Sequence, residues 1–140
     1  TKITDESLRH LANLKELRRL NLRKTKVTDA GLENLKRNSK LEALDLAYVD
    51  VNGSGFIGFS ADLIELYLNN TKTNDEGIKI IAEFKNLQVL DLSGTRVTDN
   101  AVPELMKLSA LTSLTLYNCS LTNAGKEKLR KHMPGTKILF

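Results

Sequence analysis

The feature that most constrains this 140-residue chain is a short apolar pattern that returns at a nearly constant interval. The pattern, L-x-x-L-x-L, begins at Leu17, Leu41, Leu63, Leu87 and Leu111, at intervals of 24, 22, 24 and 24 residues. A degenerate copy closes the chain, with Ile138 and Phe140 in its second and third places. A fixed period of this length is typical of solenoids, in which each unit buries its apolar face only against its neighbours.

Each copy runs into a second pattern, which reads T-x-V-T-D-x-G-L in its clearest form at residues 25–32. Related versions occupy residues 71–78, 95–102 and 119–126, and the chain opens with one at residues 1–8. The first pattern alternates apolar and polar residues and predicts a short strand with one buried face. In the second pattern a Thr or Asn predicts a helix N-cap, and the following Asp suits the positive end of the helix dipole. The predicted caps are Thr4, Thr28, Asn52, Asn74, Thr98 and Thr122.

Two small positions of the repeat carry further expectations. The hydroxyl groups at Thr25, Thr71 and Thr95 are expected to bond the backbone of the neighbouring coil, with Val49 and Cys119 in the equivalent place. Gly31, Gly55, Gly77 and Gly125 are expected to let the helix start lie close to the next coil. Apolar residues at helical spacing, such as Leu8, Leu11 and Leu14, are expected to face the core.

Two stretches depart from the regular pattern. The copy at residues 41–62 is two residues short and contains Gly53, Gly55 and Gly58, which argues against a regular helix and favours an irregular, single-turn connection. Phe56 and Phe59 still fall in inward positions. Pro103, which lacks a backbone N–H, predicts a helix that begins late or with a 3₁₀ turn.

These patterns predict one α/β domain over residues 1–140, a right-handed solenoid with a short parallel sheet on its concave face and short helices on its convex face. The predicted units are a half-repeat at 1–16, repeats at 17–40, 41–62, 63–86, 87–110 and 111–134, and a terminal strand at 135–140. The opening half-repeat lacks a strand, so the strand with Leu20 and Leu22 is expected to leave a sheet edge uncovered. We expect a monomer, with a homodimer through this edge as the alternative.

The repeat resembles the leucine-rich-repeat family over essentially the whole chain, and its frame is similar to the 24-residue subtype of planctomycete and other bacterial proteins. It is also similar to the cysteine-containing repeats that follow F-boxes, although only Cys119 matches their cysteine position. The ending at residues 129–138 is similar to natural carboxyl ends of the bacterial group, which suggests a true C-terminus and an N-terminus that is either artificial or a domain boundary. The resemblance implies a non-enzymatic module that binds a protein or another ligand on its inner sheet, and we expect a protein partner.

The frame predicts which side chains point out from the sheet. All three tyrosines fall in this outward set, and all four phenylalanines fall in inward positions. Since Tyr and Arg are common interface anchors, we hypothesise a partner-binding patch centred on Tyr67. The predicted concave site comprises Arg19, Asn21, Arg23, Asp45, Tyr48, Glu65, Tyr67, Asn69, Asp91, Thr115 and Tyr117. The alternatives are a structural cap of a longer scaffold without its own ligand, and a substrate-recognition module of a ubiquitin-ligase-like or effector protein.

Catalytic, metal and cofactor sites are not predicted. Asp45 and Asp91 are expected two strands apart, about 10 Å, which is too far to share one ion. His10 and His132 have no second ligand at metal-binding spacing, and Cys119 occupies a structural position. The chain also lacks the glycine-rich runs that bind nucleotide phosphates. We therefore expect no enzymatic activity and no cofactor.

The net charge of +4 is modest, but basic residues gather near both ends. The amino-terminal group comprises Lys15, Arg18, Arg19, Arg23, Lys24 and Lys26, and the carboxyl-terminal group Lys126, Lys128, Arg130 and Lys131. Without interleaved aromatic residues these groups favour edge protection or partner steering over nucleic-acid binding. The sequence has no apolar run of about 18 residues, so no membrane contact is predicted. The absence of paired-cysteine caps favours an intracellular over an extracellular setting.

Overall fold

A computed structural model describes residues 2–60 and 62–140, and within them the chain forms one open sheet of six parallel strands. The strands follow one another in chain order, so each pairs with the strand of the next coil. Their bounds are β1 Arg19–Asn21, β2 Ala43–Asp45, β3 Glu65–Tyr67, β4 Val89–Asp91, β5 Ser113–Thr115 and β6 Lys137–Leu139. Equivalent repeat positions are in register: Leu20, Leu44, Leu66, Leu90, Leu114 and Ile138 form one line across the sheet.

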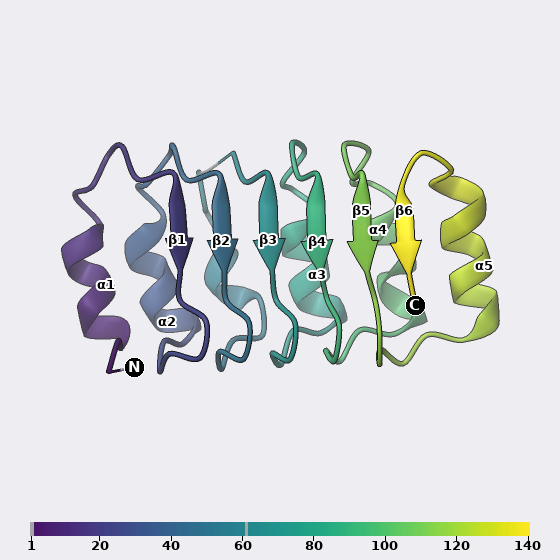
Figure 1. Ribbon diagram of the computed structural model, residues 1–140, viewed down its shortest axis with the longest axis horizontal. Coiled ribbons are helices and arrows are strands. Elements are labelled where there is room, and N and C mark those ends of the chain that lie inside the picture. The colour runs from purple at the N-terminus through teal and green to yellow at the C-terminus, as the bar shows by residue number, and fades with distance from the viewer. Residues whose placement is uncertain (1, 61) are drawn as a thin grey trace.

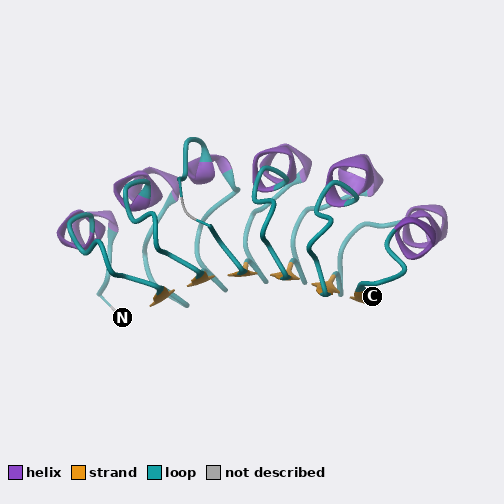
Figure 2. Cartoon of the chain, turned by 90° about the horizontal axis from the view of Figure 1, so that it is seen from above, coloured by secondary structure: helices purple, strands orange, loops and turns teal. Residues whose placement is uncertain are grey.

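The outer layer consists of short helices, one for each turn of the solenoid (Figure 1). They are α1 Asp5–Leu11, α2 Asp29–Leu32 with the 3₁₀ turn η1 Glu33–Leu35, the 3₁₀ turn η2 Ser54–Phe56, α3 Asp75–Ile81, η3 Asp99–Ala101 leading into α4 Val102–Leu105, and α5 Asn123–His132. Figure 2 shows the molecule as an arc with the strands on its concave side and the helices on its convex side. The predicted solenoid architecture is confirmed.

The core lies between the two layers and is built mainly from the repeated leucines. Leu44, Leu66, Leu90 and Leu114 are fully buried, and so are the helix residues Leu32, Ile78 and Leu105. At the β1 edge Leu22 is buried as well, at 1% exposure, whereas Leu20 is half-buried. The edge therefore exposes less leucine surface than the sequence suggested. Leu14, which was expected to face the core, is 48% exposed because α1 already ends at Leu11.

Five of the predicted N-caps directly precede their helices, but in the irregular coil the residue that caps η2 is Gly53 and not the predicted Asn52. The aspartate that follows four of the predicted caps has a second role. Asp5 accepts hydrogen bonds from the backbone N–H and the hydroxyl of Thr28, both at 2.7 Å, and Thr28 lies one coil further along. Asp75 contacts Thr98 in the same way, at 2.8 and 2.6 Å, and Asp99 contacts Thr122. In the irregular coil, Asp29 accepts from backbone N–H groups instead. These carboxylates form an aspartate ladder that joins successive coils.

The glycines of the repeat lie close to the preceding coil, so the expectation of contact with the next coil was wrong. A Cβ atom on Gly31 or Gly125 would lie 2.1 or 2.2 Å from the carboxylate oxygen of Asp5 or Asp99, respectively. Gly31 and Gly125 thus make room for an aspartate carboxylate of the preceding coil, whereas Gly77 faces the carbonyl oxygen of Asn52. At Ala101, the equivalent position of another coil, the helix opens as the 3₁₀ turn η3.

The buried threonines also bond differently from the prediction. The hydroxyls of Thr25, Thr71 and Thr95 donate to the carbonyl three residues earlier in their own coil, at 2.6–2.7 Å, and not to a neighbouring coil. Cys119, in the same place, reaches the neighbouring carbonyl of Leu92 at 3.1 Å. The threonines therefore close the tight turn after each strand, and backbone ladders and the aspartates connect the coils.

One polar residue is fully buried in a position that leucine occupies elsewhere. Asn38 stands 24 residues after Leu14, and its amide Nδ2 donates to the carbonyls of Leu11 and Leu14 at 3.0 and 2.9 Å. Its Oδ1 has no hydrogen-bond partner among the described residues. Asn38 thus satisfies the carbonyl groups at the end of α1 at the expense of one buried, unpaired oxygen.

Both predicted irregularities are confirmed. The short copy contains the single 3₁₀ turn η2, preceded by Gly53 with a positive φ of 103°. The coil with Pro103 begins with the 3₁₀ turn η3 and becomes α-helical at Val102, since proline cannot donate the hydrogen bond that would start an α-helix at the cap.

Candidate functional site

The concave face is a grid whose columns are the strands and whose rows are equivalent repeat positions. One row contains Asn21, Asp45, Tyr67, Asp91, Thr115 and Leu139, so Tyr67 lies between Asp45 and Asp91 in register. The row before it contains Arg19, Ala43, Glu65, Val89, Ser113 and Lys137. Ten of the eleven predicted side chains are brought onto this grid, or within two residues of it, by the constant register. The parallel sheet, not any local motif, assembles the candidate site.

A polar cluster spans three strands around Tyr67. The guanidinium of Arg19 on β1 donates to Glu65 on β3 at 3.0 Å, and the Tyr67 hydroxyl donates to the same carboxylate oxygen at 3.2 Å. By register, this bridge crosses β2 at Ala43, which is 6% exposed. A cleft of about 280 Å³ lies here, bounded by Arg19, Asn21, Asp45, Glu65 and Tyr67. Ala43 at the start of β2 and Ala47 two residues past its end are both buried.

The electrostatics of this cluster are negative around the tyrosine ring. Burial raises the pKa of the Tyr67 phenol above its ordinary value of 10.0, and the neighbouring Glu65 carboxylate raises it further. The phenol therefore stays protonated at physiological pH and keeps its hydrogen on the side of Glu65. A partner would meet Tyr67 as a neutral hydrogen-bonding ring between two carboxylates.

The polar residues of the Tyr67 row also stabilise their own turns. Asn21, Asp45 and Asp91 each accept the backbone N–H two residues later, at 2.9–3.0 Å, which is an Asx-turn. The Ser93 hydroxyl donates to Asp91 at 2.7 Å as well. Sequence reasoning assigned these side chains only to a partner, although Asx residues before a turn are a recognisable local signal. One carboxylate oxygen of Asp45 therefore already accepts a hydrogen bond from the backbone N–H of Ala47.

The remaining predicted residues lie toward the carboxyl ends of the strands. Arg23, Asn69 and Tyr117 occupy one row, and Tyr117 is 45% exposed. Tyr48 is 47% exposed but lies in the turn beyond β2, with a φ of 60°, so it stands at the rim of the concave face. The Arg23 guanidinium lies 5.0 Å from the centre of its ring.

The leucine-rich-repeat profile matches residues 13–36 and 85–105 of the chain. An internalin of Listeria monocytogenes has a similar structure over 99% of this chain, with a TM-score of 0.77 and 20% sequence identity. A leucine-rich-repeat protein of Leptospira interrogans is similar over 94% of the chain, with a TM-score of 0.72 and 24% identity. The chain therefore has the leucine-rich-repeat fold, and two of its segments match the profile of that family. It spans 38% of the internalin and 33% of the Leptospira protein. None of the curated proteins compared with it matches in sequence.

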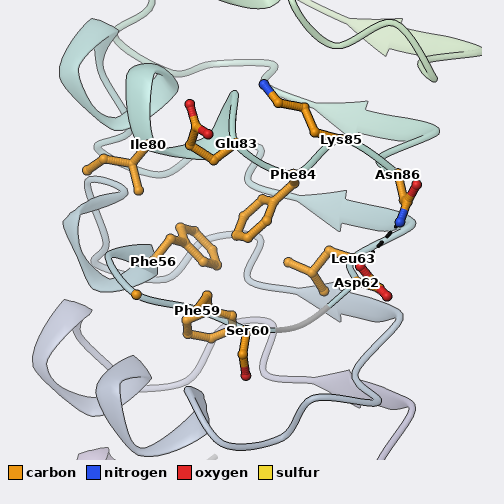
Figure 3. Close-up of a pocket in the computed structure, with 11 residues that line it drawn as sticks. Phe56, Phe59, Ser60, Asp62, Leu63, Ile80, Glu83, Phe84, Lys85 and Asn86 are labelled. Carbon is orange, nitrogen blue, oxygen red and sulfur yellow. Dashed lines mark hydrogen bonds between the residues drawn. The ribbon is translucent and has the colours of Figure 1, made fainter.

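The convex side of the leucine-rich-repeat domain carries a second hollow, which sequence reasoning did not single out. Phe56, Phe59 and Phe84 meet edge to face, with ring centres 5.2, 5.7 and 6.4 Å apart, and line a cleft of about 340 Å³ (Figure 3). The cleft lies where η2 replaces a full helix, so the aromatic rings fill space that helices fill elsewhere. The shortened repeat and its glycines were the available signal.

No group of three His, Cys, Asp or Glu side chains among residues 2–60 and 62–140 is arranged to hold a metal ion. His132 lies in the last turn of α5, where its Nδ1 is 2.9 Å from the carbonyl oxygen of Lys128. No helix in the described part of the chain is long and apolar enough to cross a membrane.

Proposed function

We propose that this leucine-rich-repeat domain is a non-enzymatic protein-interaction module that binds its partner on the concave face around Tyr67. Leucine-rich-repeat domains are in general interaction modules, and the observation that carries the assignment here is the distribution of aromatic residues. Phe56 and Phe84 are buried in the core, whereas Tyr48 and Tyr117 are 47% and 45% exposed on the concave side or its rim.

The mechanism is rigid presentation. Backbone hydrogen bonds between coils hold the strands in register, so the surface side chains vary on a fixed frame. The Arg19–Glu65–Tyr67 cluster is already formed within the chain, so a partner pays little to order Tyr67 before contacting it. Truncated aromatic anchors of this kind typically cost about 2 kcal/mol of binding free energy each.

The test is an affinity capture from lysate of the source organism with three baits. They are the parent chain, the double variant Tyr67→Ala/Tyr117→Ala, and a convex-side control, Ile57→Ala, which replaces another exposed residue. We expect a protein that the parent and Ile57→Ala retain and the double variant loses. A protein retained equally by all three would place binding elsewhere, and the absence of any specific protein would favour the structural-cap alternative.

A further inference from the structure

The edge of the sheet at the carboxyl ends of the strands carries a line of equivalent turn residues. Lys24, Tyr48, Asn70, Gly94 and Asn118 all have positive φ angles, between 55° and 67°. Backbone N–H groups of this line bond to the next coil, for example from Lys24 to Ala47 at 2.9 Å and from Tyr48 to Asn69 at 3.0 Å. Side chains that leave these turns are thus spaced by about 4.8 Å from coil to coil, along the lower edge of the sheet in Figure 1.

Cationic side chains dominate this edge, which we call the basic rim: Arg23, Lys24, Lys26, Lys72 and Arg96. Lys26, Lys72 and Arg96 each stand two residues or fewer beyond the turn line of their coil. Asp50 is the carboxylate that lies among them, paired with Lys72 at 2.7 Å. Among the described residues, Arg23, Lys24, Lys26 and Arg96 form no ion pair.

The amino ends of the strands are different, although the sequence grouped their cations with these. Arg18 pairs with Glu42, and Arg19 pairs with Glu65 at 3.0 Å. At the basic rim, by contrast, the Arg23 guanidinium and the Lys24 ammonium lie 5.0 and 5.1 Å from the centre of the same Tyr48 ring. Two cations on one ring repel each other, and an anion placed between them would relieve that repulsion.

The rim also has the shape to accept a chain segment. A cleft of about 490 Å³ runs from Tyr48 and Asp50 across Asn70 to Lys72, Gly94 and Arg96. Gly94 has a φ of 67° and no side chain, which leaves the cleft open between two cations. Tyr48 forms one wall and is 47% exposed.

We propose that the basic rim binds an extended acidic segment of a partner protein, with carboxylates along the rim and Tyr48 contacting its backbone or an apolar side chain. The inference rests on the proposed role as a protein-interaction module and adds the chemistry of the partner. The structure favours an acidic peptide over a nucleic acid because the adjoining concave floor carries Asp45, Glu65 and Asp91. These carboxylates repel a long polyanion and confine an anionic ligand to the rim.

The experiment uses a fluorescein-labelled octaglutamate peptide and measures its anisotropy against the whole chain in about 50 mM salt. The rim variant is Arg23→Gln/Lys24→Gln, and the matched control is Lys128→Gln/Lys131→Gln on the exposed side of α5. Both pairs lower the formal net charge from +4 to +2. We expect the rim variant to weaken binding about tenfold and the control to leave it within about twofold.

Three results would overturn the inference: no binding of octaglutamate by the parent chain, an equal loss in both variants, or tighter binding of a 16-nucleotide oligo-dT than of octaglutamate. The second would assign binding to net charge alone, and the third would assign the rim to nucleic acid. Because the peptide assay involves neither Tyr67 nor Tyr117, its outcome is independent of the lysate capture. Octaglutamate binding without any captured protein would refute the concave site and leave the rim intact.

Discussion

Replacing Gly77 by alanine tests why the repeat has glycine at this position: because coils are in close contact there, or because of helix propensity. Gly77 lies in the first turn of α3, where propensity alone predicts that alanine stabilises the helix by up to about 1 kcal/mol. The structure predicts the opposite sign. A Cβ atom at this position would lie 2.2 Å from the carbonyl oxygen of Asn52 and 3.2 Å from the Cα atom of Gly53.

The neighbouring backbone has little freedom to retreat. The N–H of Asn52 donates to Asp29 at 2.8 Å, and the N–H of Gly53 donates to the same carboxylate at 3.2 Å. Overpacking a well-packed site costs about 1–3 kcal/mol, and contact with restrained backbone belongs at the upper end. After the propensity gain is subtracted, Gly77→Ala should lower the free energy of unfolding by about 2 kcal/mol.

Urea denaturation followed by circular dichroism at 222 nm measures this difference. With a slope of about 2 kcal/mol per M, the midpoint should fall by about 1 M. Gly135→Ala is the control, because a Cβ atom there meets nothing within 4 Å; its midpoint should be unchanged or slightly raised. If Gly77→Ala matches or exceeds the parent in stability, the coil contact does not limit the packing and the reasoning is refuted.

Three further predictions concern the coil connections and the core. Hydrogen bonds from the Thr122 hydroxyl and backbone N–H lower the pKa of Asp99 below its ordinary value of 3.8. The Asp99 carboxylate therefore stabilises the fold above pH 3.8, and this stabilisation is lost as the pH falls through the lowered pKa. Urea midpoints should show Asp99→Asn less stable than the parent at pH 7 and nearly equal to it at pH 2.5. Asn38→Asp replaces a buried donor by a charged acceptor that faces two carbonyl groups. Thermal unfolding should show a loss of stability of about 3 kcal/mol, and part of this loss should be recovered at pH 4. No change would show that the Asn38 hydrogen bonds contribute nothing. Phe56→Ala should cost about 3–5 kcal/mol in chemical denaturation and the half-buried Phe59→Ala clearly less; equal losses would contradict the burial of the two rings.

Much of the architecture was predictable because the repeat signals are local. The alternation around Leu44 or Leu66 predicts a strand with one buried face, and the cap at Thr122 predicts where α5 begins; both were found. The shortened repeat around Gly53 and the late α-helix at Pro103 were also predictable, since each follows from the conformational limits of one residue type. The concave position of Tyr67 between two aspartates followed from the period alone.

Other assignments depended on which coil a polar side chain reaches, and these the sequence left undetermined. Asp99 was assigned to its own helix but accepts hydrogen bonds from Thr122 in the next coil. The Thr71 hydroxyl was predicted to bond a neighbouring coil but donates to a carbonyl of its own coil. Both choices depend on side-chain directions and on the offset between stacked coils, which no local pattern encodes.

By itself, then, the sequence determined the solenoid, the register of its strands and the set of residues on each face, because a constant period leaves one way to stack identical units. Tertiary structure decided how the charges on those faces combine. Arg19 pairs with Glu65 across an intervening strand, whereas Arg23 and Lys24 share the Tyr48 ring without a carboxylate. Residues 20–50 positions apart in the chain become neighbours only when coils stack about 4.8 Å apart. This stacking decides which cations pair with a carboxylate, as Arg19 does, and which remain in the basic rim.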